Sequence, residues 1–315
     1  MSETLQFPVS YACPVHKTAL ADWRCKQCGR DYPTVHGIPV LLHHSNSVFS
    51  EADYLPQDGY GGYDGASGYS GKLDRSTGLR RVYHRAMMRL MDAEPPRRDF
   101  GVADALAAIL AEQPQASILV IGAGERMLAG NVVYTDVAFG KHVSCIADAH
   151  DLPFEAHSFD ACVACAVLEH VLDPYRCVEE IRRVLKPGGY VYAETPFMQP
   201  VHMREYDFTR FTHLGHRRLF RHFAELRSGT TAGTGTSAGQ ILRYALAALS
   251  DRPRTRRWLK LAGLLGTYPL RWLDYLVHAN ESDYDAASGF YFFGRLQGEP
   301  LPDRELLRCF RGSRC

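Results

Sequence analysis

The chain has 315 residues, 46% of them hydrophobic and 23% charged, with a formal net charge of +1. This length can bury a large core, and the near-neutral charge gives no general reason to expect nucleic-acid binding. No signal peptide and no apolar run of about 18 residues occurs, so a spanning helix is not expected. The nine cysteines, an odd count partly within apolar segments, favour free thiols and a cytoplasmic location.

Residues 1–44 hold a candidate metal site. Cys13 and His16 form a C-x2-H pair, and Cys25 and Cys28 form a C-x2-C pair eight residues later. Two-residue spacing lets both side chains of each pair turn toward one ion, and four sulfur and nitrogen ligands suit tetrahedral structural zinc. So short a segment has little core of its own, so a metal would supply folding energy. The alternative is that Cys13 is a buried thiol and His16 a surface residue.

With its closing stretch YPTVHGIPVLL, the segment resembles the small zinc-ribbon heads of some methyltransferases, including certain rRNA guanine methyltransferases. The resemblance implies that the module helps to hold a substrate or a partner.

Residues 45–98 contain a Gly- and Tyr-rich stretch, GYGGYDGASGYSGKLD, whose composition favours turns and irregular chain. The stretch is either a tether or a lid over the active site, and its tyrosines favour a lid. Residues 79–91 then predict an amphipathic helix with a basic face, and Pro95 and Pro96 end it.

From residue 99 the pattern alternates between helix and strand. We expect a helix at 102–112, strands at 117–122, 131–137 and 142–148, a further strand that starts near 159, a helix capped by glycines in DPYRCVEEIRRVLKPGG, and a strand in YVYAETP. This alternation predicts an α/β fold with a doubly wound, mostly parallel sheet, and such sheets bind ligands beyond the carboxyl ends of their strands.

Glycines and carboxylates follow these strands. Gly122 and Gly124 come directly after the first strand, where the backbone can approach a ligand closely. Asp136 ends the second strand, where a carboxylate can accept both hydroxyls of a ribose. Asp148 ends the third strand, where a carboxylate can accept a hydrogen bond from an adenine amine.

The ordered motifs DAHDLPF, FD, VLEHV and EEIRRVLKPGG are similar to those of class I S-adenosylmethionine-dependent methyltransferases, the group that includes ubiquinone-biosynthesis enzymes. The resemblance covers residues 117–227 and the strand SGFYFFGRL, and it implies a Rossmann-like fold with S-adenosylmethionine as cofactor. A dehydrogenase is the alternative, but the chain lacks the GxGxxG that binds a pyrophosphate. Val120 replaces an acid frequent in the family. The implied cofactor contacts are Gly122, Ala123, Gly124, Asp136, Val137, Asp148, Ala149, His150, Cys165 and Ala166.

The segment after the fifth strand, ETPFMQPVHMREYDFTRFTHLGHRRLF, leaves the sheet at the mouth of the expected cofactor site. We expect His202 to act as a base, with Tyr206 and Arg210 binding substrate. His170 is a further substrate contact or packs near the cofactor. The alternative for EYDFTRFT is a structural corner in which Asp207 pairs with Arg210.

Residues 231–280 have helical periodicity and many arginines, and we expect their apolar faces to cover the active site as a cap. We expect the arginines to face solvent, and the alternative is that they contact a membrane or an anionic substrate. The chain divides into a zinc-ribbon-like module (1–44), linker or lid plus helix (45–98), methyltransferase core (99–230), helical insertion (231–280), final core strand (281–297) and tail (298–315).

The leading functional hypothesis is O-methylation of a small molecule, a glycan or a natural-product intermediate. The first alternative is an RNA methyltransferase that uses the module and the arginines to bind phosphates. The second is an inactive cofactor-binding partner protein, suggested by Val120 and by Arg126 in place of a third glycine.

Overall fold

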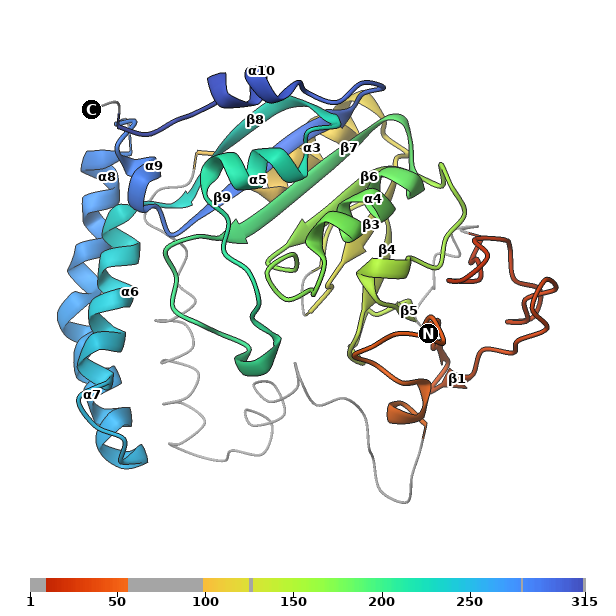
Figure 1. The fold of residues 1–315 in the computed structure, drawn as a ribbon, viewed down its shortest axis with the longest axis horizontal. Coiled ribbons are helices and arrows are strands. Elements are labelled where there is room, and N and C mark those ends of the chain that lie inside the picture. Colours follow the sequence, from red (N-terminus) through yellow and green to blue (C-terminus); the bar gives the residue numbers. More distant parts are fainter. Residues whose placement is uncertain (1–9, 56–98, 125–126, 279, 314–315) are drawn as a thin grey trace.

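The computed structural model describes residues 10–55, 99–124, 127–278 and 280–313. Within them, seven strands form one sheet in the order β5-β4-β3-β6-β7-β9-β8 (Figure 1). Neighbouring strands from β5 to β7 are parallel, and β9 is antiparallel to both of its neighbours. In chain order the strands are β3 (Ser117–Ile121), β4 (Asn131–Asp136), β5 (Cys145–Ile146), β6 (Phe159–Cys165), β7 (Leu185–Pro196), β8 (Phe223–Ala232) and β9 (Gly289–Leu296). The predicted Rossmann-like α/β fold is confirmed.

The central strands are apolar throughout because both faces of the sheet are covered. All five residues of β3 are buried, and alternate residues enter different clusters: Leu119 and Ile121 on one face, Ile118 and Val120 on the other. Helix α4 (Pro174–Val184) contributes its apolar side to the first cluster, and helix α3 (Val102–Glu112) contributes to the second. The core is therefore two apolar layers with the sheet between them.

The predicted glycine cap of α4 is wrong. The helix starts as the sequence indicates, with Asp173 accepting a hydrogen bond from the Arg176 amide at 3.0 Å and Pro174 in the first turn. It ends at Val184, since Leu185 is already extended and pairs with Phe159 as the first residue of β7. The two glycines of LKPGG therefore lie within the strand, where a Cβ at Gly189 would come within 3.0 Å of two backbone oxygens.

A helical pair extends from one side of the sheet, away from β5 (Figure 1). It consists of α6 (Thr234–Ala247) and α7 (Pro253–Thr267). Helix α6 follows the edge strand β8, a strand that the sequence pattern did not reveal. The remaining helices are η1 (Glu51–Asp53), η2 (Ala149–Asp151), η3 (Arg204–Tyr206), α5 (His213–Leu219), η4 (Tyr268–Leu273), α8 (Asp274–Val277), α9 (Asp283–Ala286) and α10 (Asp303–Arg308). No helix in the described ranges is both long and apolar enough to span a bilayer.

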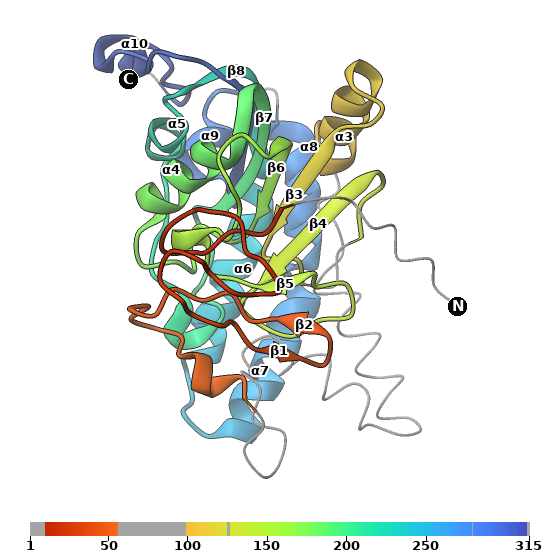
Figure 2. The ribbon, with the colours of Figure 1, turned by 90° about the vertical axis from the view of Figure 1, so that its right-hand side faces the viewer.

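The amino-terminal segment packs against the β5 edge of the sheet (Figures 1 and 2). Its strands β1 (Thr34–Val35) and β2 (Ile38–Pro39) form a hairpin, and the Leu41 amide then donates to the carbonyl of Ile146 at 2.9 Å. The Ala12 amide donates to the carbonyl of Pro153 at 2.8 Å. Cys13, Cys25, Tyr32 and Leu41 belong to the same buried cluster as residues of β6 and α4. The segment therefore shares its core with the sheet.

Helix α5 carries two histidines into the core. His213 and His216 are 7% and 2% exposed, and three of their four ring nitrogens have no hydrogen-bond partner among the described residues. Burial lowers the pKa of His213 to about 4 and that of His216 to about 3, with nearby cationic groups adding to the effect. Both rings are therefore neutral in the folded chain near neutral pH.

These histidines predict acid sensitivity. Because the unfolded chain binds protons at these positions below about pH 6.5 and the folded chain does not, the free energy of unfolding falls as the pH decreases toward about 4. Each histidine contributes up to about 1.4 kcal/mol per pH unit in that window. Urea unfolding between pH 7 and pH 4.5 should show a shallower pH dependence for His216→Leu than for the parent. The exposed His44→Leu is the matched control, and equal slopes for His216→Leu and the parent would refute the prediction.

Candidate functional site

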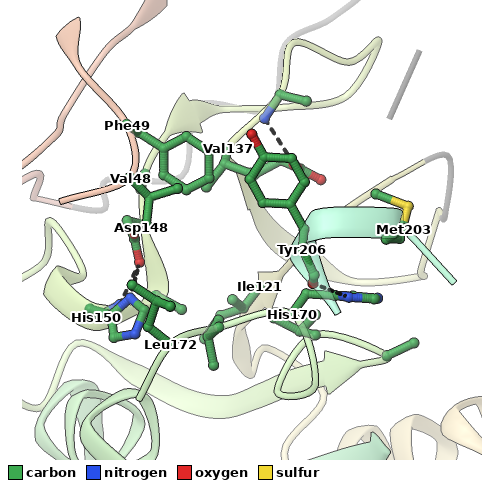
Figure 3. Close-up of a pocket in the computed structure, with 18 of the residues that line it drawn as sticks. Val48, Phe49, Ile121, Val137, Asp148, His150, His170, Leu172, Met203 and Tyr206 are labelled. Atoms are coloured by element: carbon green, nitrogen blue, oxygen red, sulfur yellow. Dashed lines mark hydrogen bonds and ion pairs between the residues drawn. The ribbon is translucent and has the colours of Figure 1, made fainter. Parts of the chain in front are cut away.

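A pocket lies at the carboxyl ends of the parallel strands, next to the point where the strand order reverses between β3 and β6 (Figure 3). Its lining comes from the segments after β3, β4, β5 and β6, together with residues 48–49 and 203–208. Among the residues proposed from sequence, those that line the pocket are Gly122, Gly124, Asp136, Val137, Asp148, Ala149, His150, Ala166, His170 and Tyr206. Those outside the lining are Ala123, Cys165, His202 and Arg210.

The loop after β3 brings bare backbone to the pocket. Gly122 has φ +66°, and a Cβ there would lie 2.5 Å from a methyl carbon of Val167. Gly124 has φ +52°. Both backbone conformations favour glycine, and Gly122 also needs the space. The loop therefore presents backbone to a ligand at close range.

Asp136, the last residue of β4, is tied to this loop. Its Oδ2 accepts a hydrogen bond from the Gly124 amide at 3.0 Å, and its Oδ1 accepts one from the Ala138 amide at 2.9 Å. Burial raises the pKa of Asp136, and the amides of Gly124, Ala138 and Val137 oppose that shift. Each carboxylate oxygen can accept a further hydrogen bond, so Asp136 retains capacity for a ligand hydroxyl.

Asp148 caps η2 and joins two parts of the chain. Its Oδ1 accepts from the His150 amide at 2.9 Å and contacts the His150 ring at 2.6 Å, and its Oδ2 accepts from the Asn46 side chain at 2.7 Å. Burial acts to raise the pKa of Asp148, but the His150 ring and the Asn46 amide outweigh it and lower the pKa. A buried carboxylate thus links the amino-terminal segment to the pocket.

Aromatic and aliphatic side chains that the sequence analysis missed form much of the pocket. The rings of Phe49 and Tyr206 stack with centroids 6.3 Å apart and planes 11° from parallel, and Figure 3 shows both beside the cavity. No local pattern marks Phe49, because it reaches the pocket through the packing of the amino-terminal segment. The other missed lining residues include Val48, Val167, Leu172, Met203 and Phe208.

The loop after β7 forms a buried ion pair. Arg210 holds both carboxylate oxygens of Asp207, through a short contact from Nη1 to Oδ1 and a 2.7 Å bond from Nη2 to Oδ2. Asp207 Oδ2 also accepts from the His202 amide at 2.7 Å. Burial acts to raise the pKa of Asp207, but Arg210 and the His202 amide lower it. This pair is the structural corner that was the alternative for EYDFTRFT. The Arg210 guanidinium binds Asp207 and does not line the pocket.

His202 faces a buried carboxylate. Its Nε2 lies 3.6 Å from Glu169 Oε1, and its Nδ1 lies 3.4 Å from Asp207 Oδ2. The Glu169 carboxylate raises the pKa of His202, while burial opposes that shift. The His202 ring also meets the His170 ring edge to face, with centroids 4.7 Å apart. His202 is thus one side chain behind the pocket lining.

Cys13, His16, Cys25 and Cys28 converge, with all four donor atoms within 4.8 Å of one another. His16 Nδ1 lies 3.5 Å from Cys13 Sγ and 3.7 Å from Cys25 Sγ. Burial acts to raise the pKa of Cys25, but the backbone amides of Cys28 and Gln27 lead the opposing effects and lower it to about 6. Gly29, directly after Cys28, has left-handed backbone with φ +72°, which favours glycine. The spacing seen in the sequence therefore produces a four-residue Cys/His cluster.

The helical insertion contributes no described residue to the lining of this pocket. The helices pack against each other and against η4, yet Ile241, Trp258 and Leu265 stay exposed, so the cap remains a prediction. Arg252, Arg254, Arg256 and Arg257 are exposed, as expected for a solvated face. The predicted lid and its helix fall within residues 56–98, outside the described residues.

Residues 99–193 match the family described as a methyltransferase domain. The chain is 33% identical over 120 residues to the demethylmenaquinone methyltransferase of Clavibacter sepedonicus, with 37% of this chain and 44% of that protein covered. It is 29% identical over 166 residues to an uncharacterized methyltransferase of Mycobacterium sp. (strain JLS), with 44% of this chain and 65% of that protein covered. The chain thus spans less than two thirds of the length of these relatives.

Among solved structures, the Haemonchus contortus phosphoethanolamine N-methyltransferase 2 in complex with S-adenosyl-L-methionine is similar at 17% identity and a TM-score of 0.38. The alignment covers 73% of this chain and 60% of that one, and at this score it carries no argument about function. The family match covers α3, the strands β3 to β6 and α4, whose loops line the pocket. The motifs DAHDLPF, FD, VLEHV and EEIRRVLKPGG lie in the same region. We conclude that residues 99–193 belong to the class I S-adenosylmethionine-dependent methyltransferase family.

Proposed function

We propose that the chain transfers a methyl group from S-adenosylmethionine to an oxygen of a small molecule, a glycan or a natural-product intermediate. The observation that carries this proposal is the joined unit of the Gly122–Gly124 backbone and the Asp136 carboxylate at the carboxyl edge of the sheet. The names of the demethylmenaquinone methyltransferase relatives support a small-molecule acceptor.

The pocket fits a sulfonium nucleoside. A Cβ at Gly122 would collide with Val167, so the close approach of the backbone is built into the loop. Asp136 would accept the ribose hydroxyls, while Asp148 and His150 would lie beside the base. Ala166, at φ +55° directly after β6, would face the methionine part. The loop has no pyrophosphate-binding glycine pattern, and this cofactor has no pyrophosphate to bind.

The bound cofactor would supply the activated methyl group. The protein would align an acceptor oxygen in the remaining part of the pocket, where positioning alone contributes roughly 7–11 kcal/mol in favourable reactions. His170, Tyr206, Met203 and Phe208 line that part and are the proposed acceptor contacts. His202, which meets the His170 ring, is the proposed group for taking up the hydroxyl proton.

We also propose that Cys13, His16, Cys25 and Cys28 bind structural zinc. Three thiols and one imidazole within 4.8 Å of one another are a donor set that zinc prefers. Cys13 and Cys25 are fully buried, so an ion there would join the segment to the core that it shares with the sheet.

RNA is the second candidate acceptor, because α7 exposes three arginines and its N-cap residue Arg252 is a fourth. The purified chain can be incubated with S-adenosylmethionine carrying a labelled methyl group and with either the small-molecule fraction or the RNA of a cell extract. We expect label in the small-molecule fraction. Label in RNA alone, lost as salt increases, would replace the leading proposal with the RNA alternative. Absence of label despite cofactor binding would favour an inactive cofactor-binding partner protein.

A further inference from the structure

Glu169, beside the pocket lining, carries a buried carboxylate that lacks hydrogen-bond donors. The residue is 0% exposed, and neither Oε1 nor Oε2 accepts a hydrogen bond from any described residue. Its ion-pair contacts within the described ranges are His170 at 3.7 Å and His202 at 3.6 Å, both to Oε1. An isolated buried carboxylate is costly unless a cation or a donor compensates it, so this one calls for a partner.

The backbone fixes which His170 nitrogen faces this carboxylate. His170 Nδ1 lies 2.7 Å from the carbonyl oxygen of Tyr206. A carbonyl only accepts hydrogen bonds, so Nδ1 carries the proton and donates it there. In the neutral ring Nε2 then has a lone pair, and this atom lies 3.7 Å from Glu169 Oε1. Two acceptors therefore face each other.

His202 faces the same oxygen from another side. Asp207 lies 3.4 Å from Nδ1, and Nε2 is the atom turned toward Glu169. The loop is held there by the hydrogen bond from the His202 amide to Asp207 and by left-handed backbone at Met203 and Arg204, with φ of 56° and 53°. Strained backbone that persists in a structure often marks a functional position. In metal sites, a histidine that binds the ion through one ring nitrogen often has a carboxylate next to its other ring nitrogen. Asp207 has that position beside His202.

The three donor atoms have the spacing of a metal site. Glu169, His170 and His202 each offer one atom, and these atoms lie within 4.8 Å of one another. Bonds of about 2.1 Å to a tetrahedral ion place ligands roughly 3.4 Å apart, so shifts of a few tenths of an ångström to about one ångström would close the site. A single shared proton would compensate only one of the two contacts to Glu169 Oε1, whereas one cation could bind all three side chains.

We propose that Glu169, His170 and His202 bind a divalent transition-metal ion such as Zn²⁺ at the edge of the pocket. Two imidazoles and one carboxylate are a common donor set for catalytic zinc, and three protein ligands leave a coordination position open. His170 lines the pocket, and its side chain and that of His202 are 18% and 37% exposed, so the open position is accessible to a ligand.

The role of this ion rests on the proposed function. An acceptor hydroxyl bound to the open position would lose its proton to solvent, because the ion lowers the pKa of the hydroxyl. Its oxygen would then form a bond to the methyl carbon as the bond from that carbon to sulfur breaks, leaving a neutral thioether. His202 would serve as a ligand in this scheme and would no longer be needed as the proton acceptor.

The site can be tested with zinc alone. Full-length protein dialysed with one equivalent of Zn²⁺, to fill the Cys/His cluster, is titrated with further Zn²⁺ by calorimetry. We expect a second equivalent to bind. Glu169→Gln and His202→Gln should each weaken that second event by about 100-fold or more, because each removes one of three ligands. The exposed Glu205→Gln, in the same loop, is the matched control and should titrate like the parent.

Substitution of the buried Glu169 could disrupt the fold. His202→Gln is the second variant because the His202 side chain is more exposed than that of Glu169. A second zinc event in the parent that Glu169→Gln and His202→Gln both leave unchanged would overturn the site, as would a parent that binds one equivalent in total. A second equivalent lost in both variants supports the site even if no methyl transfer is found, so failure of the proposed function is distinguishable from failure of the metal site.

Discussion

Asp136→Ala is expected to weaken binding of S-adenosylhomocysteine by roughly 10- to 100-fold, because a hydrogen bond to a charged group contributes about 1.5–3 kcal/mol. The same carboxylate accepts from the Gly124 and Ala138 amides, so its loss also loosens the glycine loop that approaches the ligand. Isothermal titration of the variant and the parent with S-adenosylhomocysteine measures the difference.

Two further variants separate these effects. Asp136→Asn keeps one acceptor oxygen, so it should bind between the parent and Asp136→Ala. Asp31→Ala removes a carboxylate that is 71% exposed and is not part of the pocket lining, and it should bind like the parent. An Asp136→Ala protein that binds with parental affinity would remove Asp136 from the proposed site.

Removal of metal from the Cys/His cluster is expected to destabilise the amino-terminal segment and to weaken cofactor binding. Structural zinc contributes about 10–16 kcal/mol in isolated zinc-finger peptides, and this segment has little apolar core that is its own. Asn46, Val48 and Phe49 connect it to the pocket. Cys25→Ser should therefore lower the midpoint of thermal unfolding, and the affinity for S-adenosylhomocysteine should fall with it.

The matched control is Cys309→Ser on the far side of the fold, where the thiol donates weakly to the carbonyl of Glu305. It should keep the zinc content and the melting temperature of the parent. If Cys25→Ser loses its zinc but melts and binds like the parent, the segment does not depend on the metal. Elemental analysis of the parent that finds no zinc after refolding with Zn²⁺ would end the zinc proposal.

The fold and the pocket position follow from local sequence patterns. Short apolar runs such as SILVI, alternating with amphipathic helices, define a sheet that is buried on both faces. Because the carboxyl ends of parallel strands meet at one edge, Gly122, Asp136 and Asp148 were expected together, and all three line one pocket. These features depend on residues close to one another in the chain.

The parts that sequence reasoning missed depend on contacts between distant segments. Asn46 reaches Asp148 across about a hundred residues, and no pattern around either one encodes that pairing. Residue type alone marks His202 as a candidate base, but the fold places it against Asp207 and Glu169, and no sequence pattern marks Glu169 as its neighbour. The insertion helices are expected over the pocket, yet they pack against one another and none of their described residues lines it. Tertiary packing decided each of these outcomes.

The proposed function requires that the pocket at the carboxyl edge of the sheet binds S-adenosylmethionine. Calorimetric titration of the full-length, zinc-loaded protein with S-adenosylhomocysteine measures this binding. We expect one binding event per chain, weakened in Asp136→Ala and unchanged in Asp31→Ala. No measurable binding by the folded parent would contradict the proposed function.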